Sequence, residues 1–278
     1  MLRRGDMKRG AVALLDALGF KGIWRDHSSG DVLAALRSVA KFASEAGEIA
    51  AEALSEVSEF SDVKVEVSAF SDTLLITATT DQRPDKPPLP QDAYDQWSTI
   101  AAISAVAMVG SVSPILVPPL LYRGAIAFGE FEVSEGRFYV GPAIDEAAEF
   151  ESIADGAFVC LTPSAMRLIL GEGDGFLIKG WPVPLKNGQT YVTDVVNPLR
   201  HVRGPDFLTM AKRVARDEAS PQDDPTLWLT NRILNVFGSS KLDLVLKRQH
   251  TEALLNRARQ LVPPPVPPSV AQVFLPPS

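Results

Sequence analysis

Cysteine and histidine are scarce in this 278-residue chain, and their scarcity excludes several kinds of site. With one cysteine, Cys160, no disulfide can form within the chain, and we expect this small apolar side chain to be buried. The three histidines, His27, His201 and His250, lie far apart and lack the spacing of a zinc site. A zinc site built from cysteine and histidine is therefore not expected.

Positive charge is also in deficit, with 27 Lys and Arg against 34 Asp and Glu and a net charge of −7. This balance disfavours non-specific binding to nucleic acid or to an anionic membrane. The most apolar window, residues 100–121, contains prolines and precedes Arg123, so it predicts a core helix and a strand rather than a membrane span. The basic N-terminus lacks the apolar run of a signal peptide. We expect a cytoplasmic protein.

A phosphate-binding P-loop is missing as well. Residues 171–175, GEGDG, are rich in glycine but lack the Lys-Ser/Thr that completes the motif, so they predict a loop between a helix and a strand. The composition, 46% hydrophobic and 22% charged, is that of an ordinary globular protein with a sizeable core.

The apolar periodicity predicts a β-α-β-β-α-β order, which is typical of a ferredoxin-like core in an α+β fold. The predicted elements are a strand at 10–17, a helix at 30–60, a hairpin at 63–79, a helix at 94–109 and a strand at 120–128 that ends at Gly129. Further along we expect a hairpin at 131–140 turning at Glu135-Gly136, a helix at 143–153, a strand at 156–161, a short helix at 163–170 and strands at 176–182 and 190–196 joined by Asn187-Gly188.

After Pro198 the pattern changes. We expect one mixed α and β domain at 1–200, followed by a helical extension at 201–262. The extension contains helical patterns at 205–219, 226–237 and 241–260. The tail at 263–278 is proline-rich, which favours polyproline II as a loose end, a strap or a ligand for a partner.

Two aspartates follow apolar strands and precede turn residues. Asp16 ends the first strand, and Asp72 lies in the Phe70-Ser71-Asp72 turn of the hairpin. Such placements bring two carboxylates to one rim of a sheet, where their repulsion calls for a cation, and oxygen ligands suit Mg²⁺ or Mn²⁺. The alternative is that each aspartate only caps a turn.

Five segments resemble, in order and spacing, class III nucleotidyl cyclase domains over about residues 10–196. They are LLDALGF at 14–20, FSDTLLI at 70–76, YRGAIAFGE at 122–130, VGPAIDEAAEFESIA at 140–154 and IKGWPV at 178–183. The resemblance implies a ferredoxin-like sheet that forms a head-to-tail homodimer, with active sites at the interface that convert a nucleoside triphosphate.

The resemblance also implies the ligands of two divalent ions, Mn²⁺ or Mg²⁺, in each active site. Asp16, Asp72 and the carbonyl of Ala17 would hold the ions. The turn that contains Phe20 and Lys21 would meet the triphosphate through backbone amides.

The sequence departs from purine-specific members of that family at the positions that recognise the nucleotide base. Ser68 stands where they carry Lys or Glu, and Phe138 stands where those that use ATP carry Asp. The helix after Gly141 has Asp145 and Glu149 in place of the Asn and Arg that stabilise the transition state.

Either catalysis is damaged or another cation has taken over, and our candidates for that cation are Arg123 and Lys179. Each has the alternative of an ordinary surface ion pair. Glu149 and Glu151 are expected on a solvated helix face.

These departures are similar to the pyrimidine cyclases of bacterial anti-phage (Pycsar) systems. The resemblance implies that UTP is converted to cyclic UMP and pyrophosphate, and that this second messenger activates a separate effector. The alternatives are a cytidylate cyclase, a degenerate domain that binds a nucleotide without turnover, or a scaffold that acts through its C-terminal helices and tail.

Overall fold

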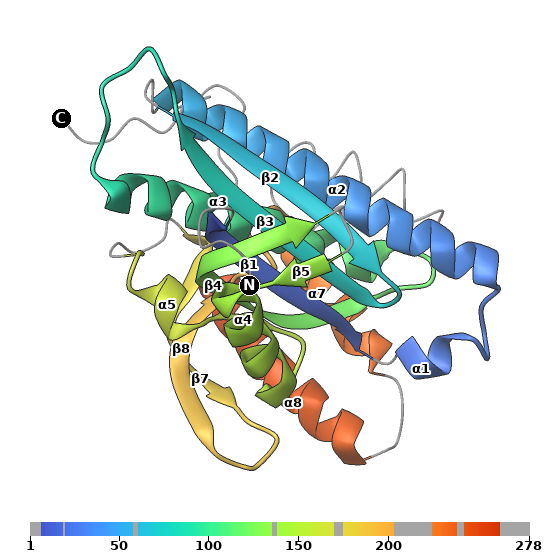
Figure 1. Cartoon of the computed structure of the whole chain (residues 1–278). Helices are drawn as coiled ribbons and strands as arrows, with labels where there is room; N and C mark the ends of the chain where they lie inside the picture. The colour runs from blue at the N-terminus through green and yellow to red at the C-terminus, as the bar shows by residue number, and fades with distance from the viewer. Residues whose placement is uncertain are drawn as a thin grey trace.

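Eight strands form one sheet in the computed structural model, which describes residues 7–18, 20–57, 61–134, 138–169, 175–202, 224–237 and 242–261. The strands are β1 (Lys8–Leu18), β2 (Ser61–Phe70), β3 (Thr73–Gln82), β4 (Leu121–Ser134), β5 (Phe138–Val140), β6 (Val159–Leu161), β7 (Leu177–Pro184) and β8 (Thr190–Val196). Their order is β2-β3-β1-β4-β6-β8-β7, with β5 paired to β4 (Figure 1). Neighbours run antiparallel except β4 and β6.

The helices pack on both faces of this sheet (Figure 1). They are α1 (Phe20–Ile23), α2 (Ser29–Val57), α3 (Gln91–Val112), the 3₁₀ turn η1 (Ser113–Ile115), α4 (Pro142–Ile153), α5 (Pro163–Met166), α7 (Pro225–Val236) and α8 (Leu242–Leu261). The elements β1, α2, β2, β3, α3 and β4 follow one another as β-α-β-β-α-β. The predicted α+β class and ferredoxin-like core are confirmed.

Strand β1 is buried on both faces because its side chains alternate between two layers of helix. Ala13 and Leu15 join the core cluster under α2 and α3, whereas Val12 and Leu14 pack with the cluster under α4. Side chains in a strand alternate with a period of two, so Asp16 lies on the α4 face.

Helix α3 is the apolar window of the sequence. With η1 it spans Gln91–Ile115, long and apolar enough to cross a membrane, but 83% of that window is buried inside the protein. We assign it to the core, as the sequence predicted.

The C-terminal helices share a second hydrophobic cluster with the far half of the sheet. Leu229 and Ile233 from α7 and Leu254 from α8 pack with Phe158 and Ile178. Removing the chain after Pro198 would therefore expose apolar side chains of β6, β7 and β8.

Some sequence predictions were wrong in detail. Gly129 does not end its strand, because β4 continues to Ser134 and pairs Gly129 with Gly10 and then Phe131 with Lys8. A Cβ added to Gly129 would stand 3.5 Å from that of Ala143, an ordinary contact, so this glycine marks no break. Strand β6 is also shorter than predicted. The Glu135-Gly136 turn, the helix at 205–219 and the tail at 263–278 lie outside the described residues.

Leu254 tests whether α8 belongs to the core. It is fully buried, so Leu254→Ala should lower the free energy of unfolding by about 2–5 kcal/mol through lost burial and a residual cavity. The matched control is Leu246→Ala on the same helix, where the side chain is 42% exposed and the expected loss is below about 0.5 kcal/mol. Urea denaturation measures both, and equal losses would contradict the packing.

His201 should make the fold sensitive to acid. Burial, followed by the charge of Arg200, lowers the pKa of His201 to about 4, and its Nε2 has no hydrogen-bond partner among the described residues. Between pH 6.5 and 4 the unfolded chain then binds a proton that the folded chain does not. Stability falls on acidification through this window, by at most about 3 kcal/mol.

The measurement is the urea midpoint at pH 7 and pH 5. His201→Gln should flatten the difference, whereas His27→Gln, which changes a part-exposed histidine, should keep it. An unchanged slope in His201→Gln would assign the acid sensitivity to other groups.

Candidate active site

The end of β1 carries the first aspartate. Asp16 pairs with Thr73 of β3 on one side and Arg123 of β4 on the other, and its side chain is 28% exposed. The strand brings this carboxylate to the point where the hydrophobic layers give way to solvent.

The turn between β2 and β3 carries the second aspartate, Asp72. Ser71 has a φ of +55° in a two-residue turn, which suits the twist of a tight hairpin. The N–H of Ala17 donates to the carbonyl oxygen of Asp72 over 3.0 Å. This bond fixes the turn against the end of β1, so Asp16 and Asp72 occupy the same end of the sheet on neighbouring elements.

The charges of both carboxylates affect the pKa of the Tyr122 hydroxyl. Burial raises the pKa of this phenol strongly, and the charges of Asp72 and then Asp16 raise it further. The Tyr122 Oη is buried and has no hydrogen-bond partner among the described residues. The negative charges of both aspartates therefore reach the same phenol at this end of the sheet.

Arg123 connects Asp16 to a third carboxylate. Its Nη2 donates to Asp16 Oδ2 over 3.1 Å, and its Nε lies 2.9 Å from Glu151 Oε1 in a close ion pair rather than an aligned hydrogen bond. The side chains of Arg123 and Glu151 are each only 15% exposed. Asp16 is thus engaged in an ion pair but still open to solvent.

The expectation that Glu151 lies on a solvated face is wrong. Burial raises the pKa of Glu151, and the positive charge of Arg123 partly offsets this. A signal in the sequence could have found it, since Ala143, Ala147 and Glu151 recur at steps of four and both alanines are buried. Asp145 and Glu149, in contrast, are exposed on α4.

Lys186 closes the row of charges beyond Glu151. Burial and the charge of Arg123 lower the pKa of this lysine, while Glu151 raises it. Its backbone N–H donates to Ile153 O over 3.0 Å, and its ammonium donates to the carbonyl of Ser152. The hairpin loop after β7 is thereby fixed to the end of α4.

Ser68 has a partner that the sequence did not indicate. Its hydroxyl hydrogen-bonds that of Tyr139, whose ring meets Phe70 edge to face with centroids 5.4 Å apart. Phe138 pairs its backbone with Ser134, and its side chain lies outside the description. Because neighbours in a strand face opposite ways, alternation in β5 was the signal that could have singled out Tyr139.

The turn after β1 is only partly described. The Phe20 side chain is buried and packs edge to face on Trp24 at 5.5 Å, so any contact of Phe20 with a ligand would use its backbone. Lys21 follows Phe20 in the first turn of α1, and the structure does not describe the side chain of Lys21.

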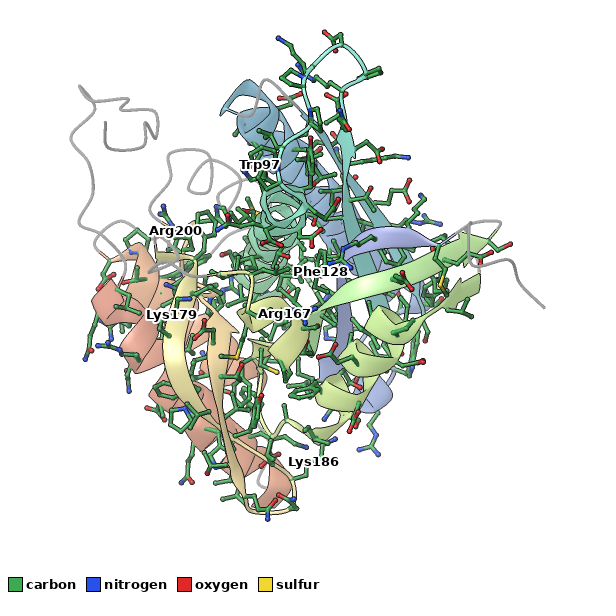
Figure 2. All side chains as sticks on the ribbon, turned by 60° about the vertical axis from the view of Figure 1, so that its left-hand side comes forward. Trp97, Phe128, Arg167, Lys179, Lys186 and Arg200 are labelled. Carbon is green, nitrogen blue, oxygen red and sulfur yellow. The ribbon has the colours of Figure 1, made fainter. Side chains whose placement is uncertain are left out.

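Lys179 is not brought to the aspartates. Its Nζ donates to Asp194 Oδ2 over 2.8 Å and to Ile169 O over 3.3 Å, while Gly180 N–H donates to Asp194 Oδ1 over 2.9 Å. Figure 2 shows Lys179 and Lys186 at separate places along the β7 hairpin. Strands β7 and β1 stand four spacings apart, about 19 Å at roughly 4.8 Å each.

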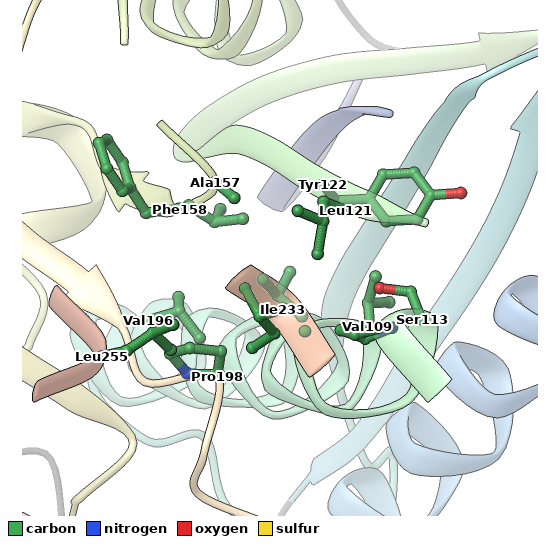
Figure 3. A pocket seen from close by; sticks show the side chains of 14 residues that line it. Val109, Ser113, Leu121, Tyr122, Ala157, Phe158, Val196, Pro198, Ile233 and Leu255 are labelled. Carbon is green, nitrogen blue, oxygen red and sulfur yellow. The ribbon is translucent and has the colours of Figure 1, made fainter. Parts of the chain in front are cut away.

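A small cavity lies behind the site. It holds about 30 Å³ and is lined by apolar side chains that include Val109, Ile233 and Leu255. The Tyr122 hydroxyl points away from it (Figure 3). Its small volume and apolar lining do not suit a nucleotide.

Comparisons with known proteins find similar structures, whereas no family model and no curated protein matches the sequence. The guanylate cyclase domain of RhGC from Catenaria anguillulae, in complex with GTP, has 15% identity and a TM-score of 0.43, covering 68% of this chain and 96% of that one. The adenylyl cyclase CyaB from P. aeruginosa has 15% identity and a TM-score of 0.43 over 68% and 93%. Monomeric adenylate cyclases from Trypanosoma brucei have 15% identity and a TM-score of 0.43 over 70% and 92%.

Proposed function

We propose that this chain is a nucleotidyl cyclase that converts a pyrimidine nucleoside triphosphate to its 3′,5′-cyclic monophosphate and pyrophosphate, with UTP as the preferred substrate. The observation that carries the proposal is the bond from Ala17 N–H to Asp72 O, 3.0 Å long, which fixes two aspartates at one end of the sheet. The segments around both aspartates are those that resemble class III cyclases.

The donor set fits divalent cations that prefer oxygen. Asp16, Asp72 and the carbonyl of Ala17 offer oxygen alone, which suits Mn²⁺ or Mg²⁺. Among the described residues, no group of three or more His, Cys, Asp and Glu gathers to hold a metal. Magnesium sites of this kind use one or two carboxylates together with substrate phosphates, so we propose Asp16, Ala17 and Asp72 as ligands of two such ions.

The reaction forms a bond between the 3′ oxygen and the α-phosphorus and breaks the bond from that phosphorus to pyrophosphate. When bound, the ions would lower the pKa of the 3′-hydroxyl and neutralise charge on the phosphates. Arg123 would add positive charge beside Asp16, and the backbone amides of Phe20 and Lys21 would hold the triphosphate. The chain mainly positions groups.

The base would meet Ser68 and Tyr139. Two hydroxyls can donate and accept, which suits the polar edge of uracil or cytosine, and no Lys, Glu or Asp is present in this pair to read a purine. The contact of Phe138 with the base stays a prediction from the sequence alone. Cytidine triphosphate is the alternative substrate.

Lys179 argues for two copies of the chain. Its distance from β1, about 19 Å, is too great for one triphosphate to touch both the aspartates and Lys179 of a single chain. We therefore propose a homodimer with active sites at its interface. The product would act in the cytoplasm as a second messenger on a separate effector in anti-phage defence.

A second candidate function is a domain that binds a nucleotide without turnover. The contact of Arg123 with Asp16 favours it, as do the exposed acids Asp145 and Glu149 on α4.

Product identification separates the candidates. With Mn²⁺ and an equimolar mixture of ATP, GTP, CTP and UTP, mass spectrometry should detect a cyclic pyrimidine monophosphate. Asp72→Asn should lower turnover by about 100-fold or more, since it removes a charge that acts on the transition state. Asp81→Asn, an exposed aspartate of the same hairpin, is the control and should keep activity. Nucleotide binding without any cyclic product would establish the second candidate instead.

Tyr139→Phe tests the contact with the base. Loss of one hydroxyl should lower kcat/KM for the preferred pyrimidine by about 2–10-fold, the worth of one hydrogen bond, and should change the ratio of products. Tyr191→Phe, whose ring packs on Phe150, should leave that ratio unchanged. An unchanged ratio in both variants would remove Tyr139 from the binding site.

A further inference from the structure

Arg123 uses different nitrogens for its two carboxylates. The Nη2 atom reaches Asp16 at 3.1 Å, and Nε lies 2.9 Å from Glu151. The two contacts are therefore separable, because the outer end of the guanidinium can leave Asp16 while the inner nitrogen stays beside Glu151.

The separation matters because a cation and Arg123 compete for Asp16. A divalent ion that binds this carboxylate displaces or repels the guanidinium. A largely buried guanidinium without a partner is unfavourable, so the competition would weaken the ion. Glu151 removes this conflict, since Arg123 keeps one carboxylate when Asp16 turns away.

The position of Glu151 is also fixed by the structure around it. It lies in the last turn of α4, and the end of that helix is fixed by Lys186, whose N–H bonds Ile153 O at 3.0 Å and whose ammonium bonds Ser152 O. Asp16 stands on a different element, the end of β1. Movement at the carboxylate of Asp16 therefore need not carry Glu151 with it.

We propose that Glu151 is a positioning residue, which retains Arg123 beside the site when a divalent cation takes Asp16 and leaves the outer nitrogens of Arg123 facing the triphosphate. The inference rests on the proposed function, because it assumes a cation at Asp16 and Asp72. It gives a role to a buried acid that the reaction itself does not use.

The test is Mn²⁺ affinity, measured by electron paramagnetic resonance of the free ion, with kcat followed in parallel. Glu151→Gln leaves Arg123 with Asp16 as its one carboxylate among these contacts, so Mn²⁺ should bind about fivefold more weakly. Arg123→Gln removes the competitor, so Mn²⁺ should bind more tightly while kcat falls. In the double variant, Mn²⁺ affinity should match that of Arg123→Gln.

The double variant separates positioning from simple charge. If the loss at Glu151 persists when Arg123 is already Gln, Glu151 acts on the ion through its own charge and the inference is overturned. Glu252→Gln, an exposed acid of α8, loses the same charge and should bind Mn²⁺ like the parent. Glu151→Asp, which keeps the carboxylate, should fall between the parent and Glu151→Gln and serves if the latter does not fold.

Two failures are distinguishable. A parent protein that binds Mn²⁺ and makes product, with unchanged affinity in Glu151→Gln, overturns this inference alone. A parent that neither binds Mn²⁺ at Asp16 and Asp72 nor makes product overturns the proposed function and the inference together.

Discussion

One backbone hydrogen bond, from Ala17 N–H to the carbonyl of Asp72, sets the geometry on which the candidate site depends. It joins the end of a central strand to the turn of a neighbouring hairpin. Shifting the pairing of β1 and β3 by one residue would turn Asp16 toward the helices α2 and α3 and bury Leu15 against the wrong layer. The hydrophobic alternation of β1 therefore protects the site, because the same register that buries Ala13 and Leu15 exposes the carboxylate.

The charges around this end form an alternating series rather than an acidic cluster. Ion pairs join Asp16 of β1 to Arg123 of β4 and Arg123 to Glu151 of α4, and the charge of Glu151 raises the pKa of Lys186 in the β7 hairpin loop. Such a series lowers the repulsion that two aspartates alone would create. It also means that a bound cation is not simply added, because it must rearrange a partner that is already present. In the proposed function, the ion pair at Asp16 and the metal-bound carboxylate would be two states of one site.

Much of the fold was predictable because local periodicity and burial agree. The sequence predicts strand β1 from a hydrophobic period of two and helix α2 from a period of 3.6. It also predicts the turn at Asn187-Gly188, where Gly188 has a φ of +80°. The failures concern contacts between distant segments. Gly129 stays in its strand because β1 pairs with it across the sheet. Glu151 and Tyr139 were missed because their partners, Arg123 and Ser68, are 28 and 71 positions away. Charge alone suggested solvent for Glu151, whereas its step of four from Ala147 pointed to the sheet.

The two candidate cations differ in a way that bears on how many chains make a site. Arg123 stands beside Asp16, and Lys179 stands on the far edge strand with Asp194 beneath it. Both are held by a largely buried carboxylate, which fixes the side chain but also cancels part of its charge. A lysine held in this way remains useful to an anionic ligand only if the ligand approaches from the open side of β7. No single chain presents that side and the two aspartates to the same phosphates, since β4, β6 and β8 intervene. In the proposed homodimer, the carboxylate end of one sheet and the lysine edge of the other copy would be the two surfaces that a shared triphosphate joins.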